Sequence, residues 1–181
     1  ATVFSIIESE NSNSLWFSTH GKGVFVCTYS QAPKIQQVTN LNTQTHSWLT
    51  DDCVFSLSES YNGHIWMGTA NGVSVYNPKK DTGFAYQALP RETNASENIH
   101  VLSILESDPN TIWMSTEKDG IFKINKHPLS SELISCEQYC MENSKTINNN
   151  VQSLYIDSDN RIWAGMIGGG LNLYDPDKDI S

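Results

Sequence analysis

The chain has 181 residues, enough for one sizeable hydrophobic core. Eleven Lys and Arg residues against twenty Asp and Glu give a formal net charge of −9, which excludes non-specific binding to nucleic acid or to an anionic membrane. No apolar run approaches the roughly 18 to 20 residues that a membrane-spanning helix needs. The first residues do not form a signal peptide, so we expect either a cytosolic protein or a segment of a longer exported one.

A segment of similar sequence occurs four times along the chain. The copies are VFSIIESENSNSLWFSTHGKGVFVC from Val3, VFSLSESYNGHIWMGTANGVSVYNP from Val54, VLSILESDPNTIWMSTEKDGIFKIN from Val101 and VQSLYIDSDNRIWAGMIGGGLNLYDP from Val151. Their tryptophans, Trp16, Trp66, Trp113 and Trp163, are 50, 47 and 50 residues apart. Self-similarity at such a period predicts stacked units, as in a solenoid or a propeller.

Each copy predicts the same succession of short strands. A Val-x-Ser strand (Ser5, Ser56, Ser103, Ser153) is followed by a polar turn, a Trp strand, a turn that ends in glycine (Gly23, Gly72, Gly120, Gly170) and a third strand. More polar stretches such as GFAYQAL and ELISCEQY predict an outer strand in the first three units. Asn62-Gly63 fits a two-residue hairpin turn with positive φ at both positions. Three or four strands in about 48 residues are typical of a β-propeller blade, so we expect an all-β fold.

The packing of neighbouring blades explains this pattern. Both faces of a blade are covered, so the inner strands lose the alternation of a half-exposed sheet. We expect the small serine near the propeller axis and the tryptophan as a wedge between blades, its indole N–H donating to a backbone carbonyl. The alternative is that the four tryptophans form a row that stacks on carbohydrate.

The cysteines do not indicate a disulfide framework or a metal site. Cys136 and Cys140 lie in a stretch that is expected to be extended, which separates them by about 13 Å, beyond the reach of a disulfide. Cys27 and Cys53 lie in or next to predicted strands, and no CxxC or HxxxH spacing supports a metal site or catalytic thiol. We therefore expect no cofactor, no metal and no catalytic residue.

The repeat, V-x-S-(I/L) followed by (I/L)-W-x-(G/S)-T and G-(V/I/L), resembles the two-component regulator propeller repeat, D-x-x-G-x-(I/L)-W-(I/V/F)-G-T-x-x-G-(L/I). The resemblance covers nearly the whole chain and is strongest in SYNGHIWMGTANGVSVYN. Ser18 and Ser115 replace the usual glycine, and Met166 replaces the threonine. Small side chains should be tolerated at the glycine positions.

The resemblance implies a non-catalytic, ligand-sensing segment of the periplasmic region of a hybrid two-component receptor, which elsewhere carries a membrane helix, a histidine kinase and a response regulator. It implies an oligosaccharide as the small-molecule ligand and a ring of about seven blades. We expect a piece of such a ring, with blades at about 1–50, 51–98, 99–148 and 149–181, the last without its outer strand. Its open blade edges should self-associate. The alternatives are a propeller scaffold for protein interactions and a metal-dependent propeller lyase.

Candidate ligand-binding residues lie in the loops that enter the inner strands and in the turns between second and third strands, because these gather on one face of a propeller. They are His20, Lys22, His46, Trp48, Arg91, His100 and Lys118. Trp48 is the tryptophan outside the repeat, and it suits either sugar stacking or a hydrophobic plug or partner contact. His20 and Glu117 would be the pair needed by a lyase. The alternative for each His and Lys is a solvated side chain.

Overall fold

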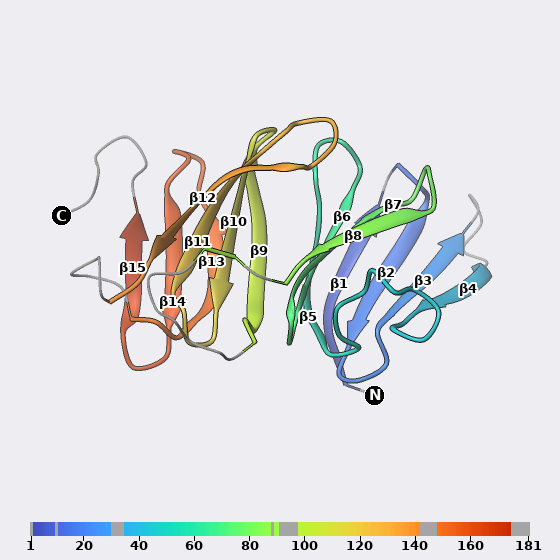
Figure 1. The fold of residues 1–181 in the computed structure, drawn as a ribbon, viewed down its shortest axis with the longest axis horizontal. Helices are drawn as coiled ribbons and strands as arrows, with labels where there is room; N and C mark the ends of the chain where they lie inside the picture. The colour runs from blue at the N-terminus through green and yellow to red at the C-terminus, as the bar shows by residue number, and fades with distance from the viewer. Residues whose placement is uncertain are drawn as a thin grey trace.

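The computed structural model describes residues 2–9, 11–29, 35–87, 89–90, 98–141 and 148–174. These residues form antiparallel sheets and turns and contain no helix, so none of them forms a helix that could span a membrane. The predicted all-β propeller architecture is confirmed (Figure 1). We call the four sheets blades 1 to 4.

In every blade, strands that follow one another in sequence pair side by side. Blade 1 consists of β1 (Val3–Ser9), β2 (Ser14–Thr19), β3 (Val24–Tyr29) and β4 (Ile35–Leu41). Blade 2 consists of β5 (Val54–Glu59), β6 (Ile65–Thr69), β7 (Gly72–Asn77) and β8 (Thr82–Tyr86). Blade 3 consists of β9 (Val101–Asp108), β10 (Thr111–Thr116), β11 (Ile121–Lys126) and β12 (Leu133–Tyr139). The described part of blade 4 consists of β13 (Val151–Ile156), β14 (Ile162–Met166) and β15 (Gly170–Tyr174).

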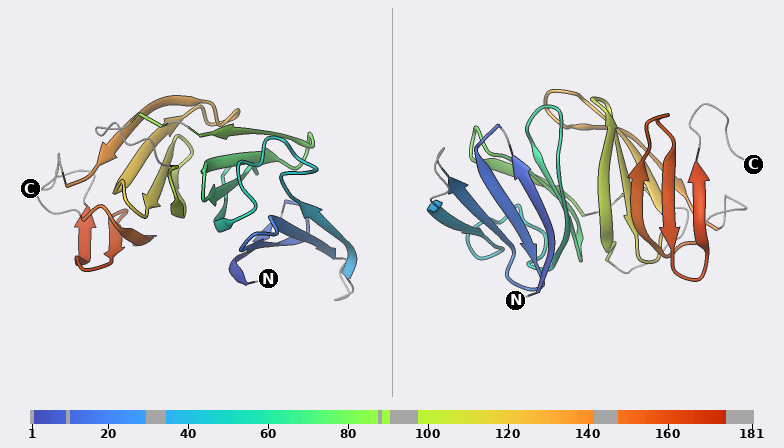
Figure 2. Two further views of the ribbon diagram at one scale, coloured as in Figure 1. Left: turned by 60° about the horizontal axis from the view of Figure 1, so that its bottom comes forward. Right: turned by 180° about the vertical axis from the view of Figure 1, so that it is seen from behind.

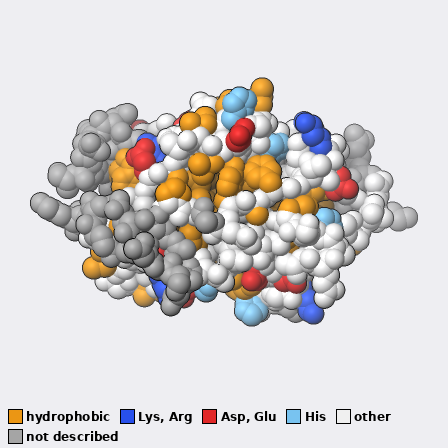
Figure 3. Space-filling model, in the orientation of Figure 1, with side chains coloured by type: hydrophobic (Ala, Val, Ile, Leu, Met, Phe, Trp, Pro, Cys, Tyr) orange, Lys and Arg blue, Asp and Glu red, His pale blue; other side chains and the backbone are white. Residues whose placement is uncertain are grey.

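The blades stand side by side in an arc, with β1, β5, β9 and β13 on its concave side (Figure 2, left). Each of these inner strands contacts the next one, and the second strand of a blade contacts the inner strand of the following blade. A complete ring of about seven blades and the limits of each blade remain predictions. Figure 3 shows hydrophobic side chains across the middle of one face of the arc, with charged side chains mainly toward its edges, where the turns lie.

Three repeated tryptophans lie between blades, as predicted. Trp16 is 2% exposed and shares a buried cluster with Val54, Ile65 and Met67 of blade 2. Trp66 lies in a cluster with residues of blade 3, and Trp113 in one with residues of blade 4. Trp163 is half-buried, since no blade within the described residues follows it. Burial of the first three indoles excludes them from a carbohydrate-stacking row.

The predicted partner of the indole N–H was wrong. Trp16, Trp113 and Trp163 donate to side-chain oxygens: Ser14 Oγ at 2.9 Å, Ser107 Oγ at 3.1 Å and Asp157 Oδ2 at 2.7 Å. Trp66 Nε1 has no partner among the described residues. Backbone carbonyls inside a sheet already accept ladder hydrogen bonds, which leaves side-chain oxygens as the available acceptors.

Burial of both faces holds for the inner strands of the middle blades but not for β1. No residue of β5 or β9 is exposed, and Val54 and Val101 are fully buried. In β1, Val3, Phe4 and Ile6 are 45% to 59% exposed. No blade within the described residues precedes blade 1, so this apolar strand lacks the neighbour that its sequence implies.

The turn before β6 also differs from the prediction. Only Gly63, with φ of 79°, has positive φ, whereas Asn62 does not. The Ser60 N–H donates to His64 O at 2.9 Å, and the Gly63 N–H donates to Ser60 O at 2.7 Å. Three residues therefore lie between the paired ends, and this longer loop needs only one left-handed residue.

A β-bulge occurs at the same place in all four inner strands. In β5, Val54 pairs with Thr69 and Ser56 with Gly68, which leaves Phe55 without a partner residue. The equivalent residues in the other blades are Phe4, Leu102 and Gln152. A Cβ at Gly68 would lie 2.4 Å from Ser56 Oγ, so small residues are required beside the bulge. Because bulges redirect side chains, the residue at this position decides which side chain the inner strand exposes near its first residue.

Candidate functional site

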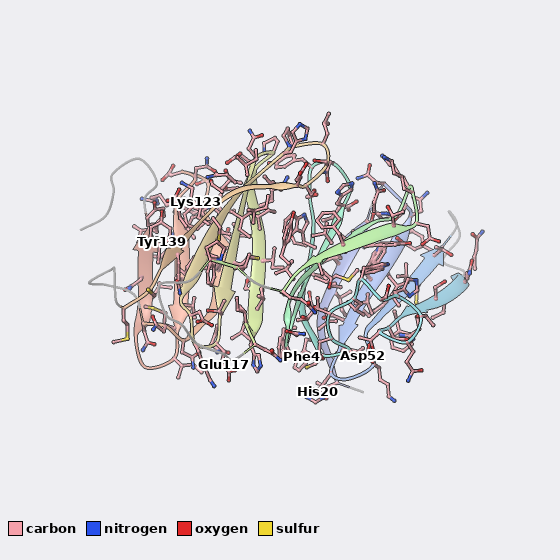
Figure 4. All side chains as sticks on the ribbon, in the orientation of Figure 1. Phe4, His20, Asp52, Glu117, Lys123 and Tyr139 are labelled. Carbon is pink, nitrogen blue, oxygen red and sulfur yellow. The ribbon has the colours of Figure 1, made fainter. Side chains whose placement is uncertain are left out.

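Two sets of loops meet at one edge of the arc. In each blade, the residue after the Trp strand donates its N–H to the carbonyl of the residue before the inner-strand valine. These pairs are His20 with Thr2 (3.0 Å), Ala70 with Cys53 (3.0 Å), Glu117 with His100 (3.1 Å) and Ile167 with Asn150 (3.1 Å). Figure 4 shows Phe4, His20, Asp52 and Glu117 along this edge. The predicted gathering of these loops is confirmed.

Backbone hydrogen bonds also join neighbouring blades at this edge. Gly23 donates to Asp52 O at 2.8 Å, and Gly120 donates to Asn149 O at 2.9 Å. Gly72 makes the equivalent bond, at 2.8 Å, to the carbonyl of residue 99. All three glycines have positive φ, which other residues adopt only at a cost. The loops are thus fixed relative to the sheets that carry them.

Aromatic rings form a row along this edge, across three blades. The ring centroids of His20 and Phe4 are 5.9 Å apart, those of Phe4 and Phe55 5.4 Å, and those of Phe55 and His100 6.1 Å. At the far end, His100 Nδ1 lies 2.7 Å from Glu117 Oε2, with the two side chains 38% and 42% exposed. We call these five residues the rim row. It presents apolar ring faces between groups that donate and accept hydrogen bonds.

The rim row contains two of the predicted residues, His20 and His100. Lys22 and Lys118 are exposed and lie in the same set of turns but are not part of the row. Arg91 lies outside the described residues. Sequence reasoning missed Phe4 and Phe55, although both occupy the x of Val-x-Ser, a signal that the repeat already contained.

Trp48 and His46 form a separate cluster. The Trp48 indole stacks on Tyr76, with centroids 5.0 Å apart and planes at 18°, and the His46 ring lies edge-on at 5.3 Å. A Cβ at Gly83 would lie 2.3 Å from indole Cδ2, so Gly83 packs directly against the ring. Trp48, in the connection between β4 and β5, is therefore half-buried by packing against β7 and β8 of blade 2, which favours the hydrophobic-plug alternative for this side chain.

The two residues that a lyase would need do not meet. Glu117 contacts His100, while His20 lies at the other end of the rim row. Within the part of the chain that the structure describes, no group of three or more His, Cys, Asp or Glu is placed to hold a metal ion. No disulfide joins any of the four cysteines.

Blade 4 gives the direct link to a known family. The sequence model of the two component regulator propeller matches residues 146–168. Residues 146–168 are thus similar to the two component regulator propeller repeat. This propeller repeat covers the entry to β13 and the Trp strand β14, the segment that recurs in the other three blades.

Solved structures resemble the whole propeller segment. The extracellular domain assigned to the hybrid two component system BT3049 of B. thetaiotaomicron is 29% identical with a TM-score of 0.69, over 97% of this chain and 21% of that one. PorZ, a surface component of the type-IX secretion system of Porphyromonas gingivalis, is 19% identical with a TM-score of 0.70, over 94% of this chain and 25% of PorZ. At that identity the likeness shows the fold alone.

A curated relative matches part of the propeller segment. Histidine kinase P4 of Formosa agariphila is 30% identical over 74 residues, which is 39% of this chain and 5% of the kinase. The chain therefore spans a small part of each of these larger proteins.

Proposed function

We propose that the chain is a non-catalytic, ligand-sensing segment of the sensor domain of a hybrid two-component receptor, on the periplasmic side of the membrane. One observation carries the proposal: 29% identity over 97% of this chain to an extracellular domain of such a system, with a TM-score of 0.69. The matching propeller repeat and the histidine-kinase relative support the same assignment.

The rim row is the proposed contact surface, and an oligosaccharide is the proposed ligand class. Phe4 and Phe55 offer ring faces to the apolar face of a sugar. The flanking polar groups of His20, His100 and Glu117 form hydrogen bonds with the sugar hydroxyls. A ligand along the row touches three blades at once. Because hydrogen bonds between blades fix the loops here, binding would favour one arrangement of the blades over others.

Calorimetric titration of the chain with a panel of neutral oligosaccharides tests this function. We expect saturable binding that Phe55→Ala weakens about tenfold or more, as expected for loss of an aromatic contact. Tyr61→Ala is the matched control, because Tyr61 is 69% exposed and lies in a turn at the opposite end of the inner strands. Equal losses of affinity in the two variants would show that the rim row is not the contact surface. Chemical conversion of a bound sugar would contradict a purely sensing role.

A further inference from the structure

A cavity lies between blades 2 and 3, at the edge opposite the rim row. Its volume is about 350 Å³. Blade 2 contributes His64, Lys80, Thr82 and Phe84 to its walls, and the turn between β11 and β12 of blade 3 contributes Leu129 and Ser130. The cavity belongs to neither the rim row nor the Trp48 cluster.

Hydrogen bonds fix the His64 ring at this cavity. The His64 side chain is 6% exposed, and its Nδ1 lies 2.9 Å from Ser131 Oγ. Asn62 Oδ1 accepts the His64 backbone N–H at 3.0 Å, which turns Asn62 Nδ2 toward Ser131 Oγ, also at 3.0 Å. Since Asn62 donates to Ser131, the Ser131 hydroxyl proton is available for His64 Nδ1. In the tautomer in which Ser131 donates to Nδ1, the imidazole carries its proton on Nε2, for which no hydrogen bond to a described residue is found.

The charges around the cavity favour a negative ligand. Burial, followed by the charges of Lys126, Lys80 and Lys79, lowers the pKa of His64, which keeps the ring neutral. Lys126 is already paired with Glu106 at 2.6 Å, whereas Lys80 has no ion pair within the described part of the chain. No lining residue carries a carboxylate. This is a donor-rich, positively charged cavity in a chain with a net charge of −9.

We propose that this cavity binds a small organic oxyanion, a carboxylate or a sulfate or phosphate ester. The Lys80 ammonium and the His64 Nε2–H hold the oxyanion, and the hydroxyls of Thr82 and Ser130 add further donors. Phe84, 36% exposed, and Leu129, 75% exposed, form an apolar wall for the body of the molecule. The site does not depend on the function proposed for the rim row.

NMR titration tests this proposal. The signals of the His64 ring are followed at constant pH and ionic strength while glucuronate, glucose 6-sulfate, glucose 6-phosphate or glucose is added. We expect at least one of the three anions to shift the His64 signals saturably, and glucose to leave them unchanged. The anions that bind identify the preferred oxyanion.

Two lysine variants separate a built site from general attraction. Lys80→Gln should weaken anion binding about tenfold or more, because it removes a charge-assisted hydrogen bond. Lys79→Gln removes the same charge from the same exposed turn but does not line the cavity, so affinity should change less than about twofold. The proposal is overturned if both variants lose anion affinity equally, if glucose binds as tightly as the anions, or if none of the three anions shifts the His64 signals saturably.

Discussion

Gly120 lies between β10 and β11 and contacts both the outer strand β12 and the loop before β13. Replacing it therefore measures how much this repeated glycine contributes to the stability of the blade. Its φ is 75°, and its N–H donates to Asn149 O of the following loop at 2.9 Å. A Cβ at this position would lie 2.1 Å from Tyr139 O in the outer strand β12. Left-handed φ costs about 1–2 kcal/mol for a residue with a Cβ. Displacing a packed strand costs about 1–3 kcal/mol more. We therefore expect Gly120→Ala to lower the free energy of unfolding by about 2–5 kcal/mol.

Gly170→Ala is the matched control. Gly170 occupies the same place in blade 4 and has φ of 72°, but a Cβ there would meet no described residue within 4 Å. Only the cost of the backbone angle applies, about 1–2 kcal/mol. Urea unfolding followed by tryptophan fluorescence compares the two variants with the parent chain. Equal losses in the two variants would refute the reasoning that contact with the outer strand makes glycine necessary.

Four further outcomes are expected. Lys126→Met should lower the free energy of unfolding in urea by about 3–5 kcal/mol, because it leaves Glu106 buried without its cation. A double variant that also removes Glu106 should recover part of this free energy, and no recovery would contradict the prediction. Burial lowers the pKa of His64, so the neutral His64 ring contributes fully to folding stability at pH values above 6.5, the ordinary pKa of histidine. This contribution is lost as the pH falls below 6.5, and an NMR titration midpoint of His64 at or above 6.5 would disprove the prediction. Trp113→Ala should lower the free energy of unfolding by about 3–5 kcal/mol and Trp163→Ala by less, since only the Trp113 indole is fully packed between blades. Comparable losses in the two variants would contradict the role of the tryptophan as a wedge between blades. We also propose that copies associate through the faces of blades 1 and 4 that no described residue covers. Light scattering should then give a mass above the 20.2 kDa of one chain, and a uniform monomer would exclude this association.

The sequence predicted the blades because a wedge between sheets needs a large side chain at a fixed place in every unit. The polar contacts between blades were not predicted. Glu59 accepts from Ser9 Oγ at 2.9 Å and Asn11 Nδ2 at 3.0 Å, and Glu106 accepts from the Tyr61 N–H at 2.6 Å. Both glutamates lie five residues after the inner-strand valine, so the repeat contained them. Their partners are 45 to 50 residues away and differ in type, which a periodic pattern does not reveal.

The candidate site could be predicted in part, for physical reasons. His20 and His100 were found because their loops meet at one edge in any propeller. An aromatic residue in a polar loop has the same sequence signature whether its ring is exposed to solvent or packed against other residues. The contact of Trp48 with Tyr76 could therefore only be seen in the structure. Phe4 and Phe55 were not singled out, because they lie in inner strands that were expected to be covered on both faces. The bulge that redirects their side chains leaves no mark in composition.

The bulge at the start of each inner strand gives the protein an interchangeable position. Val and Ser occur on either side of it in all four blades, yet the residue between them is Phe, Phe, Leu and Gln in turn. That residue has no partner in the strand ladder, so the sheet does not dictate its identity. Natural variation or an engineer can therefore exchange these few side chains for a new chemical target while the scaffold beneath them stays the same.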